Sequence, residues 1–298
     1  MSNSADYSLA NPNLKHRDSV FSLLFSEPAV LRELYSAIEG ISLPTDIPVS
    51  INTLSDVLFR KQINDISFTI DNRLVVLIEH QSSINENMPL RLLEYIGRIY
   101  EKIIDRHKVY KTRLVKIPRP EFIVLYNGVE PYPDYREMRL SEAFMDTSDL
   151  KATGDGSKSL ELKVQVYNIN NGHNPELLQK SETLGSYSRF IGKIREYKES
   201  GCALDEAMKT AIEYCVEKGI LKKFLEKHSS EVVNMLYSEF NLDEAKEVWR
   251  EEGYEEGMEQ GLAEGMEQGL AEGQEKTRQH FLELLNKGLS VEEIKQLL

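Results

Sequence analysis

Residues 65–81 read DISFTIDNRLVVLIEHQ, and this stretch decides the fold. Its first six residues alternate between polar and apolar side chains, the pattern of a strand with one buried face. Asp71-Asn72-Arg73 has the composition of a tight turn. The run LVVLI that follows is apolar at every position, which is typical of a central strand covered on both faces. The stretch therefore predicts a β-hairpin in the middle of a sheet.

The length of the turn sets which residues of this hairpin lie opposite each other. A three-residue turn at 71–73 pairs Asp65 directly with Glu79, and directly paired residues share a face with Cβ atoms about 5 Å apart. Gln81 lies two residues further on and points to the same face, whereas His80 points to the other and is expected to be a packed side chain. A two-residue turn would put the two acids on opposite faces. The register is thus a sharp test of an acid pair.

The neighbouring segments extend the hairpin into an α/β pattern. Apolar residues at helical spacing predict a helix from about Arg17 to Gly40, broken or bent near Pro28. A second long helix is expected from Met88-Pro89 to about His107. Further strands are indicated by INTLSDVLF at 51–59, FIVLYNG at 122–128 and LELKVQVYNIN at 160–170. This order predicts an α/β fold with a mixed β-sheet flanked by helices.

From Asn174-Pro175 onward the pattern is helical throughout. Helices are expected near 175–198, 203–217, 220–237 and 242–252. The chain is accordingly divided into an α/β domain at 1–173, an all-helical bundle module at 174–250, an acidic helix or linker at 251–275 and a C-terminal helical hairpin at 276–298.

Composition excludes several classes of protein. The longest apolar run, Leu74 to Ile78, is far shorter than the roughly 18 residues of a membrane helix, and the first residues show no basic and apolar signal sequence. Cys202 and Cys215 lack CxxC or HxxxH companions, which indicates reduced thiols rather than a zinc site. We therefore expect a cytoplasmic protein with no membrane partner and no organic cofactor.

The net charge of −13 is distributed unevenly. Residues 251–275 contain nine Glu and no Lys or Arg, whereas residues 91–120 contain nine Lys or Arg against three acidic residues, a local net charge of +6. Because local charge decides what a surface attracts, the acidic total does not exclude a nucleic-acid partner.

The helix that begins at Met88 separates an apolar face from a basic stripe. At 100° per residue its apolar side chains gather on one side, and the adjoining stripe contains four cations and a tyrosine: Arg91, Tyr95, Arg98, Lys102 and Arg106. Taken alone, such a stripe is most often a solvated helix face. Beside a metal site it could hold DNA phosphates, which gives affinity without sequence information.

The chemistry of phosphodiester hydrolysis suits the predicted acid pair. The reaction needs charge neutralisation and an activated water, and Mg²⁺ supplies both from a site with one or two carboxylates. Asp65 and Glu79 would provide them. Glu79 follows five apolar residues, so its carboxylate lies at the rim of a buried strand, where an acid needs a metal or a basic partner.

Several motifs of the chain together resemble one family. They are HRDSVFSLLFSEP at 16–28, IEHQSS-x5-PLRLLEY at 78–95, FIVLYNGVEPYP at 122–133, MRLSEAF at 138–144, VYNINNGHNPELL at 166–178 and the Glu/Gly-rich tail. This set resembles the PD-(D/E)XK nuclease superfamily and, more narrowly, the Rpn-type recombination-promoting nucleases, also described as transposase-like. The strongest piece is the motif at 78–95.

The resemblance implies a restriction-endonuclease-like core, dependence on Mg²⁺ with Mn²⁺ as a substitute, and cleavage of double-stranded DNA that promotes recombination at the nucleoid. Asp65 and Glu79 match the motif aspartate and glutamate. Gln81 stands where the wider superfamily has lysine; it can orient water or a ligand but supplies no charge. Asp18, in the first helix, is the acid that would assist the metal.

The acidic segment has a repeat of its own. EGMEQGLA at 256–263 recurs at 264–271, and glycine occupies every fourth position from 253 to 273. Each glycine costs a helix about 1 kcal/mol relative to Ala, so a flexible linker and a helix with a small-residue groove for another helix both stay open. We expect homo-oligomerisation through residues 251–298, and an acidic arm of this kind could also cover a basic DNA-binding face.

Two alternatives to an active nuclease remain. The glutamine at position 81 is compatible with a DNA- or protein-binding module that keeps the fold with weak or no catalysis. The tail is compatible with a regulator that pairs with itself or with a shortened form of the same protein.

Overall fold

The computed structural model describes residues 19–52, 65–146 and 159–241, together with Met258, Gly265, Met266 and Gln279. The chain forms two compact units, residues 1–240 and 241–298, and the sheet belongs to the first. The expected helix at 242–252, the repeat, the C-terminal hairpin, Arg17, Asp18 and most of the expected strand at 51–59 lie outside the described residues.

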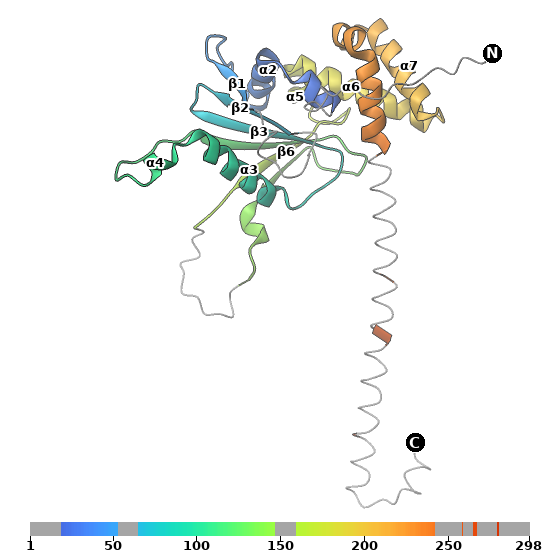
Figure 1. The fold of residues 1–298 in the computed structure, drawn as a ribbon. Helices are drawn as coiled ribbons and strands as arrows, with labels where there is room; N and C mark the ends of the chain where they lie inside the picture. Colours follow the sequence, from blue (N-terminus) through green and yellow to red (C-terminus); the bar gives the residue numbers. More distant parts are fainter. Residues whose placement is uncertain are drawn as a thin grey trace, which may run out of the picture. The chain divides into compact units, whose positions relative to one another are not determined.

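A six-stranded mixed sheet forms the centre of the first unit (Figure 1). Its strand order is β1-β2-β3-β4-β6-β5. The strands are β1 (Val49–Asn52), β2 (Asp65–Ile70), β3 (Leu74–Gln81), β4 (Arg119–Tyr126), β5 (Tyr135–Arg139) and β6 (Lys163–Asn168). β3, β4 and β6 run parallel, and the outer pairs are antiparallel. The predicted mixed sheet is confirmed.

The hairpin of β2 and β3 has the register that the sequence predicts. Asp71 and Asn72 have positive φ angles of 50° and 52°, a left-handed conformation that Asn and Asp tolerate better than most residues. With Arg73 they form a three-residue turn, and Asp65 pairs directly with Glu79. The register thus places both acids on one face of the sheet.

Helices cover both faces of the sheet. α3 (Met88–Ile103) packs on one face, where Val75 and Leu77 of β3 join the apolar side of the helix in one core. The other face is covered by α1 (Val20–Leu24), α2 (Pro28–Glu39), α5 (Pro175–Lys180) and α6 (Glu182–Glu199), and α7 (Leu204–Glu217) packs on α6. The sheet is therefore the middle layer of three.

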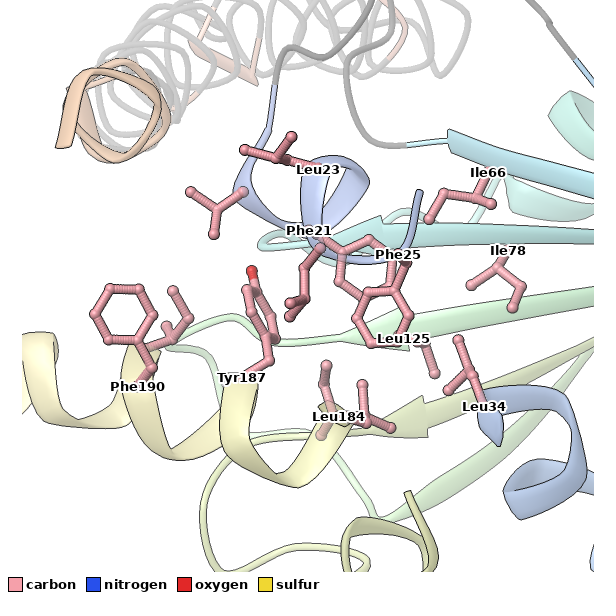
Figure 2. Packing of buried hydrophobic residues seen from close by; sticks show 14 of the residues in the cluster. Phe21, Leu23, Phe25, Leu34, Ile66, Ile78, Leu125, Leu184, Tyr187 and Phe190 are labelled. Carbon is pink, nitrogen blue, oxygen red and sulfur yellow. The ribbon is translucent and has the colours of Figure 1, made fainter. Parts of the chain in front are cut away.

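The core on the second face unites segments that are far apart in the sequence. Figure 2 shows Phe21 of α1 and Phe25, which directly follows α1, near Tyr187 of α6 and the strand residues Ile66 and Ile78. Helical residues from 222 to 241 contribute to the same core. The helices after residue 174 and the sheet therefore share one core across the expected boundary at 173.

Several expected helices have different limits in the structure. The helix from Arg17 to Gly40 is two helices, α1 and α2, with Pro28 in the first turn of α2 and Gly40 as its left-handed cap, as the break near Pro28 predicts. The helix at 175–198 is also two, α5 and α6, because Ser181 ends one and its side chain caps the other.

The helix expected to reach His107 instead ends at Ile103. Ile104 has an extended backbone, and Asp105 caps a new short helix, α4 (Arg106–Val109). β5 and the 3₁₀ turn η1 (Leu140–Ala143) were not expected from the sequence. Within the described ranges, none of the helices combines the length and apolar character required to cross a membrane.

Candidate functional site

The candidate site lies where β3 ends and α3 begins. Glu79 and Gln81 follow Val75 and Leu77 at alternate positions, so all four face α3. The apolar side of α3 packs against this face and brings the first turn of the helix over the end of β3. Glu79 is 4% exposed, a low value for an acid.

Three side chains surround the carboxylate of Glu79. Arg91 Nη2 lies 2.8 Å from Glu79 Oε1, and the Gln81 amide donates a hydrogen bond to the same oxygen at 2.8 Å. The amide nitrogen of Gln81 also lies 2.8 Å from Met88 Sδ. The guanidinium and the amide together hold this carboxylate in one orientation.

The second carboxylate oxygen of Glu79, Oε2, lacks such partners among the described residues. Glu79 Oε2 is buried and accepts no hydrogen bond from any of the described residues. Burial raises the pKa of the Glu79 carboxyl, while the charge of Arg91 and the hydrogen bond from Gln81 oppose the shift. A buried, unpartnered carboxylate oxygen is costly unless it binds something else, so Glu79 fits the role of a metal ligand.

The other predicted metal ligands can be placed only in part. Asp65 lies directly opposite Glu79 in the register of β2 and β3. Its side chain and Asp18 lie outside the described residues. Among the side chains that the structure describes, no group of three or more His, Cys, Asp or Glu could hold a metal ion.

The predicted basic stripe does not form as one surface. Arg91 turns toward Glu79, and Tyr95, only 7% exposed, packs in the core with its hydroxyl 3.2 Å from Arg91 Nη2. Arg98 is half-buried and Lys102 is exposed. Arg106 is not on α3 at all, because the helix ends at Ile103. The prediction that Arg106 lies on the same helix was therefore wrong, and so was the prediction that the ring of Tyr95 is exposed.

His80 lies on the opposite face, as the alternation predicts. Its ring stacks on Phe21 with centroids 4.7 Å apart, and its Nε2 atom is 3.2 Å from the hydroxyl of Tyr187. Burial, with a smaller contribution from Arg195, lowers the pKa of His80 to about 3. A neutral, packed imidazole agrees with the structural role expected for this residue.

Sequence reasoning missed a polar cluster at the carboxyl ends of β4 and β6. Arg195 of α6 donates to Asn127 Oδ1 at 2.9 Å and to Asn170 Oδ1 at 2.7 Å, and Asn127 Nδ2 is buried with no partner among the described residues. The sequence pattern predicts only a strand at 122–128 here, which includes Asn127 and Gly128. Because Arg195 is 68 residues away in the sequence from Asn127, no local periodicity connects them.

The geometry defines a three-layered α/β protein with a buried carboxylate, held by an arginine and a glutamine, at the end of a central strand. Residues 51–180 match the family described as "Putative transposase, YhgA-like". The segment includes Asp65, Glu79, Gln81 and all of α3. Comparison with curated proteins and with solved structures gives no match.

Proposed function

We propose that the protein is a metal-dependent DNA endonuclease that cleaves phosphodiester bonds and thereby promotes recombination. The observation that carries the proposal is Glu79: its Oε2 is buried without a partner, and its register partner is a second acid, Asp65. The match of residues 51–180 to a family of putative transposases supports DNA as the substrate.

Each residue of the site would have a distinct task. Asp65 and Glu79 would hold Mg²⁺ or Mn²⁺, which when bound neutralises phosphate charge and makes a water more acidic. Gln81 fixes Glu79 through the hydrogen bond to Oε1 and leaves Oε2 to the ion. Arg91 balances the negative charge of Glu79 while the site is empty of substrate. Asp18 is a further candidate ligand.

Relaxation of supercoiled plasmid tests the proposal. Wild-type protein with added Mg²⁺ should nick the plasmid, and Asp65→Asn and Glu79→Gln should each abolish nicking because they remove a metal ligand without changing side-chain size. Glu94→Gln is the matched control, since Glu94 is an exposed acid on α3. If wild type and all three variants behave alike, the assignment is wrong.

A second candidate function is a binding module of the same fold with weak or absent catalysis. Two features favour this module. Glu79 Oε1 already contacts Arg91 and accepts a hydrogen bond from Gln81. Position 81 also carries glutamine where the superfamily has lysine. Titration calorimetry separates the two functions. Divalent-ion binding that disappears in Asp65→Asn supports the enzyme, and no ion binding to the wild type supports the module.

The tail is proposed to form a homo-oligomer through residues 251–298. Its four-residue glycine spacing would let two helices approach closely. Light scattering should give an oligomer for the full chain and a smaller mass after deletion of these residues. An unchanged mass would contradict the proposal.

A further inference from the structure

The segment between α3 and β4 extends away from both cores. Residues 104–117, here named the basic arm, contain the single turn of α4, and α4 buries none of its residues. All residues from 105 to 114 are exposed. Figure 1 shows α4 and the turns after it projecting beyond the sheet. Burial within this unit therefore does not explain the composition of the arm.

The arm is strongly cationic. It contains five Lys or Arg and one acidic residue, Asp105, for a net charge of +4. The Asp105 side chain is used as the cap of α4, where it accepts a hydrogen bond from the backbone N–H of His107 at 3.0 Å. Four of the cations form no ion pair with any residue in the described ranges: Lys108, Lys111, Arg113 and Lys116.

Apolar side chains alternate with these charges. Tyr110 is 90% exposed and Leu114 is 76% exposed, and both lie between cationic neighbours in the sequence. Exposed rings and branched apolar side chains flanked by Lys and Arg are suited to a polyanion that also offers apolar surfaces, as nucleic acid does in its grooves and sugars.

The arm lies at the end of α3 opposite the candidate site. Arg91 contacts Glu79, and the helix ends at Ile103, twelve residues later. At 1.5 Å per residue this is roughly 18 Å. Since one base pair of duplex DNA occupies about 3.4 Å, the arm lies about five base pairs or more from a phosphate at Glu79. Exposed Lys102 lies in the last turn of α3, next to the arm.

We propose that the basic arm is the main anchor for duplex DNA, contacting backbone phosphates about half a helical turn or more from the scissile bond. The proposal rests on the proposed function for the identity of the nucleic acid. Lys108, Lys111, Arg113 and Lys116 neutralise phosphates, and Tyr110 and Leu114 contact sugars or a groove edge. The arm holds the duplex while α3 aligns it with the acid pair.

An anionic membrane is the other partner that such a composition could attract. A helix that lies in a membrane surface presents a continuous apolar face, and α4 has only four residues. The arm's apolar side chains are also separated by charges. Duplex DNA therefore fits the arm better, and the membrane becomes an outcome of the test.

The test measures binding of the full-length protein to a fluorescently labelled duplex of about 20 base pairs, or two helical turns, in EDTA so that no cleavage occurs. The arm variant combines Lys108→Ala, Lys111→Ala, Arg113→Ala and Lys116→Ala. The control variant combines Lys209→Ala, Lys218→Ala, Lys223→Ala and Lys227→Ala, which removes the same charge from exposed positions elsewhere, between residues 209 and 227.

The arm variant should bind about 30-fold or more weakly at physiological salt. The magnitude of the slope of log K against log salt should fall by about 3.6, because four phosphate contacts are lost. The control should change neither value greatly. Tyr110→Ala should weaken binding about fivefold with an unchanged slope, because contacts with sugars and a groove edge do not release counterions. Tyr237→Ala is its control on an exposed ring of another helix.

Three outcomes would overturn the proposal. The arm variant could keep the wild-type affinity and slope, or the control variant could lose as much affinity as the arm variant. The arm variant could instead lose binding to phosphatidylserine vesicles while its DNA binding stays unchanged, which would assign the arm to a membrane. Plasmid nicking distinguishes the two proposals. If the wild type binds DNA through the basic arm but never nicks the plasmid, the proposed nuclease activity is wrong and the proposed DNA binding by the arm is supported.

Discussion

Glu79 Oε1 lies 2.8 Å from Arg91 Nη2, so the acid at the end of β3 and the first turn of α3 form one charge-balanced unit. The pair is largely buried, with side-chain exposures of 6% for Glu79 and 22% for Arg91. A buried ion pair contributes little net stability, yet removal of one partner leaves an isolated charge. The site therefore depends on Arg91 even without substrate.

Arg91→Ala should lower the free energy of unfolding by about 3 kcal/mol, because Glu79 stays buried without its counter-charge. Urea denaturation at neutral pH measures the change. Lys102→Ala, on an exposed position of the same helix, is the control and should cost little. Adding Glu79→Gln to Arg91→Ala should recover part of the loss, since a neutral amide needs no counter-charge. Equal stability of Arg91→Ala and wild type would contradict the role of the pair.

Gln81→Ala should reduce plasmid nicking by about ten- to hundredfold, the usual effect of removing a group that orients a metal ligand. The hydrogen bond from Gln81 lowers the pKa of Glu79, so without it the pKa rises further. Ionised Glu79 would then form only at higher pH, and the pH profile of Mn²⁺ binding should move upward. A profile identical to that of the wild type would show that Gln81 does not act through Glu79.

The hairpin and the packing face of α3 could be predicted because local patterns determine them. Alternation in DISFTI and the three-residue turn fix the pairing of Asp65 with Glu79 without reference to the rest of the chain. The apolar spacing of α3 likewise identifies its buried side correctly, through Leu92, Ile96 and Ile99.

Other features depend on contacts that the sequence does not display. The helical projection places Arg91 in an exposed stripe because it does not include the sheet, where Arg91 pairs with Glu79. Asp105, which ends the helix by capping the next one, is a common N-cap residue and was the available signal that Arg106 leaves α3. β5 was missed because charged residues obscure its alternation around buried Met138.

Acid should destabilise the protein through His80. Its folded-state pKa is about 3 because the imidazole is buried, whereas its ordinary value is 6.5. The neutral form is favoured in the folded state, so this stability is complete above pH 6.5 and is lost as the pH falls from 6.5 towards 3. At about pH 5 the loss is roughly 2 kcal/mol. Urea denaturation from neutral pH to pH 5 measures it, and His80→Asn should show a smaller dependence. Parallel curves for both proteins would refute the assignment.

Two glycines near the site should respond to alanine in opposite directions. A Cβ on Gly128 would overlap the carbonyl oxygen of Ser82, directly after β3, and would lie 2.5 Å from the hydroxyl of Tyr126. Since Ser82 contributes backbone, the loop between β3 and α3 must move, and Gly128→Ala should cost about 2 kcal/mol or more. Gly97, exposed on α3, has no atom within 4 Å of such a Cβ.

Gly97→Ala should therefore stabilise the protein by about 0.5–1 kcal/mol, because alanine loses less backbone entropy in a helix. Chemical denaturation of both variants gives the comparison. Because Ser82 follows Gln81 directly, Gly128→Ala should also weaken Mn²⁺ binding, whereas Gly97→Ala should leave it unchanged. If Gly128→Ala has wild-type stability, Gly128 does not pack closely on the loop between β3 and α3 in solution. In that case only α3 would hold Gln81 and Glu79 in position.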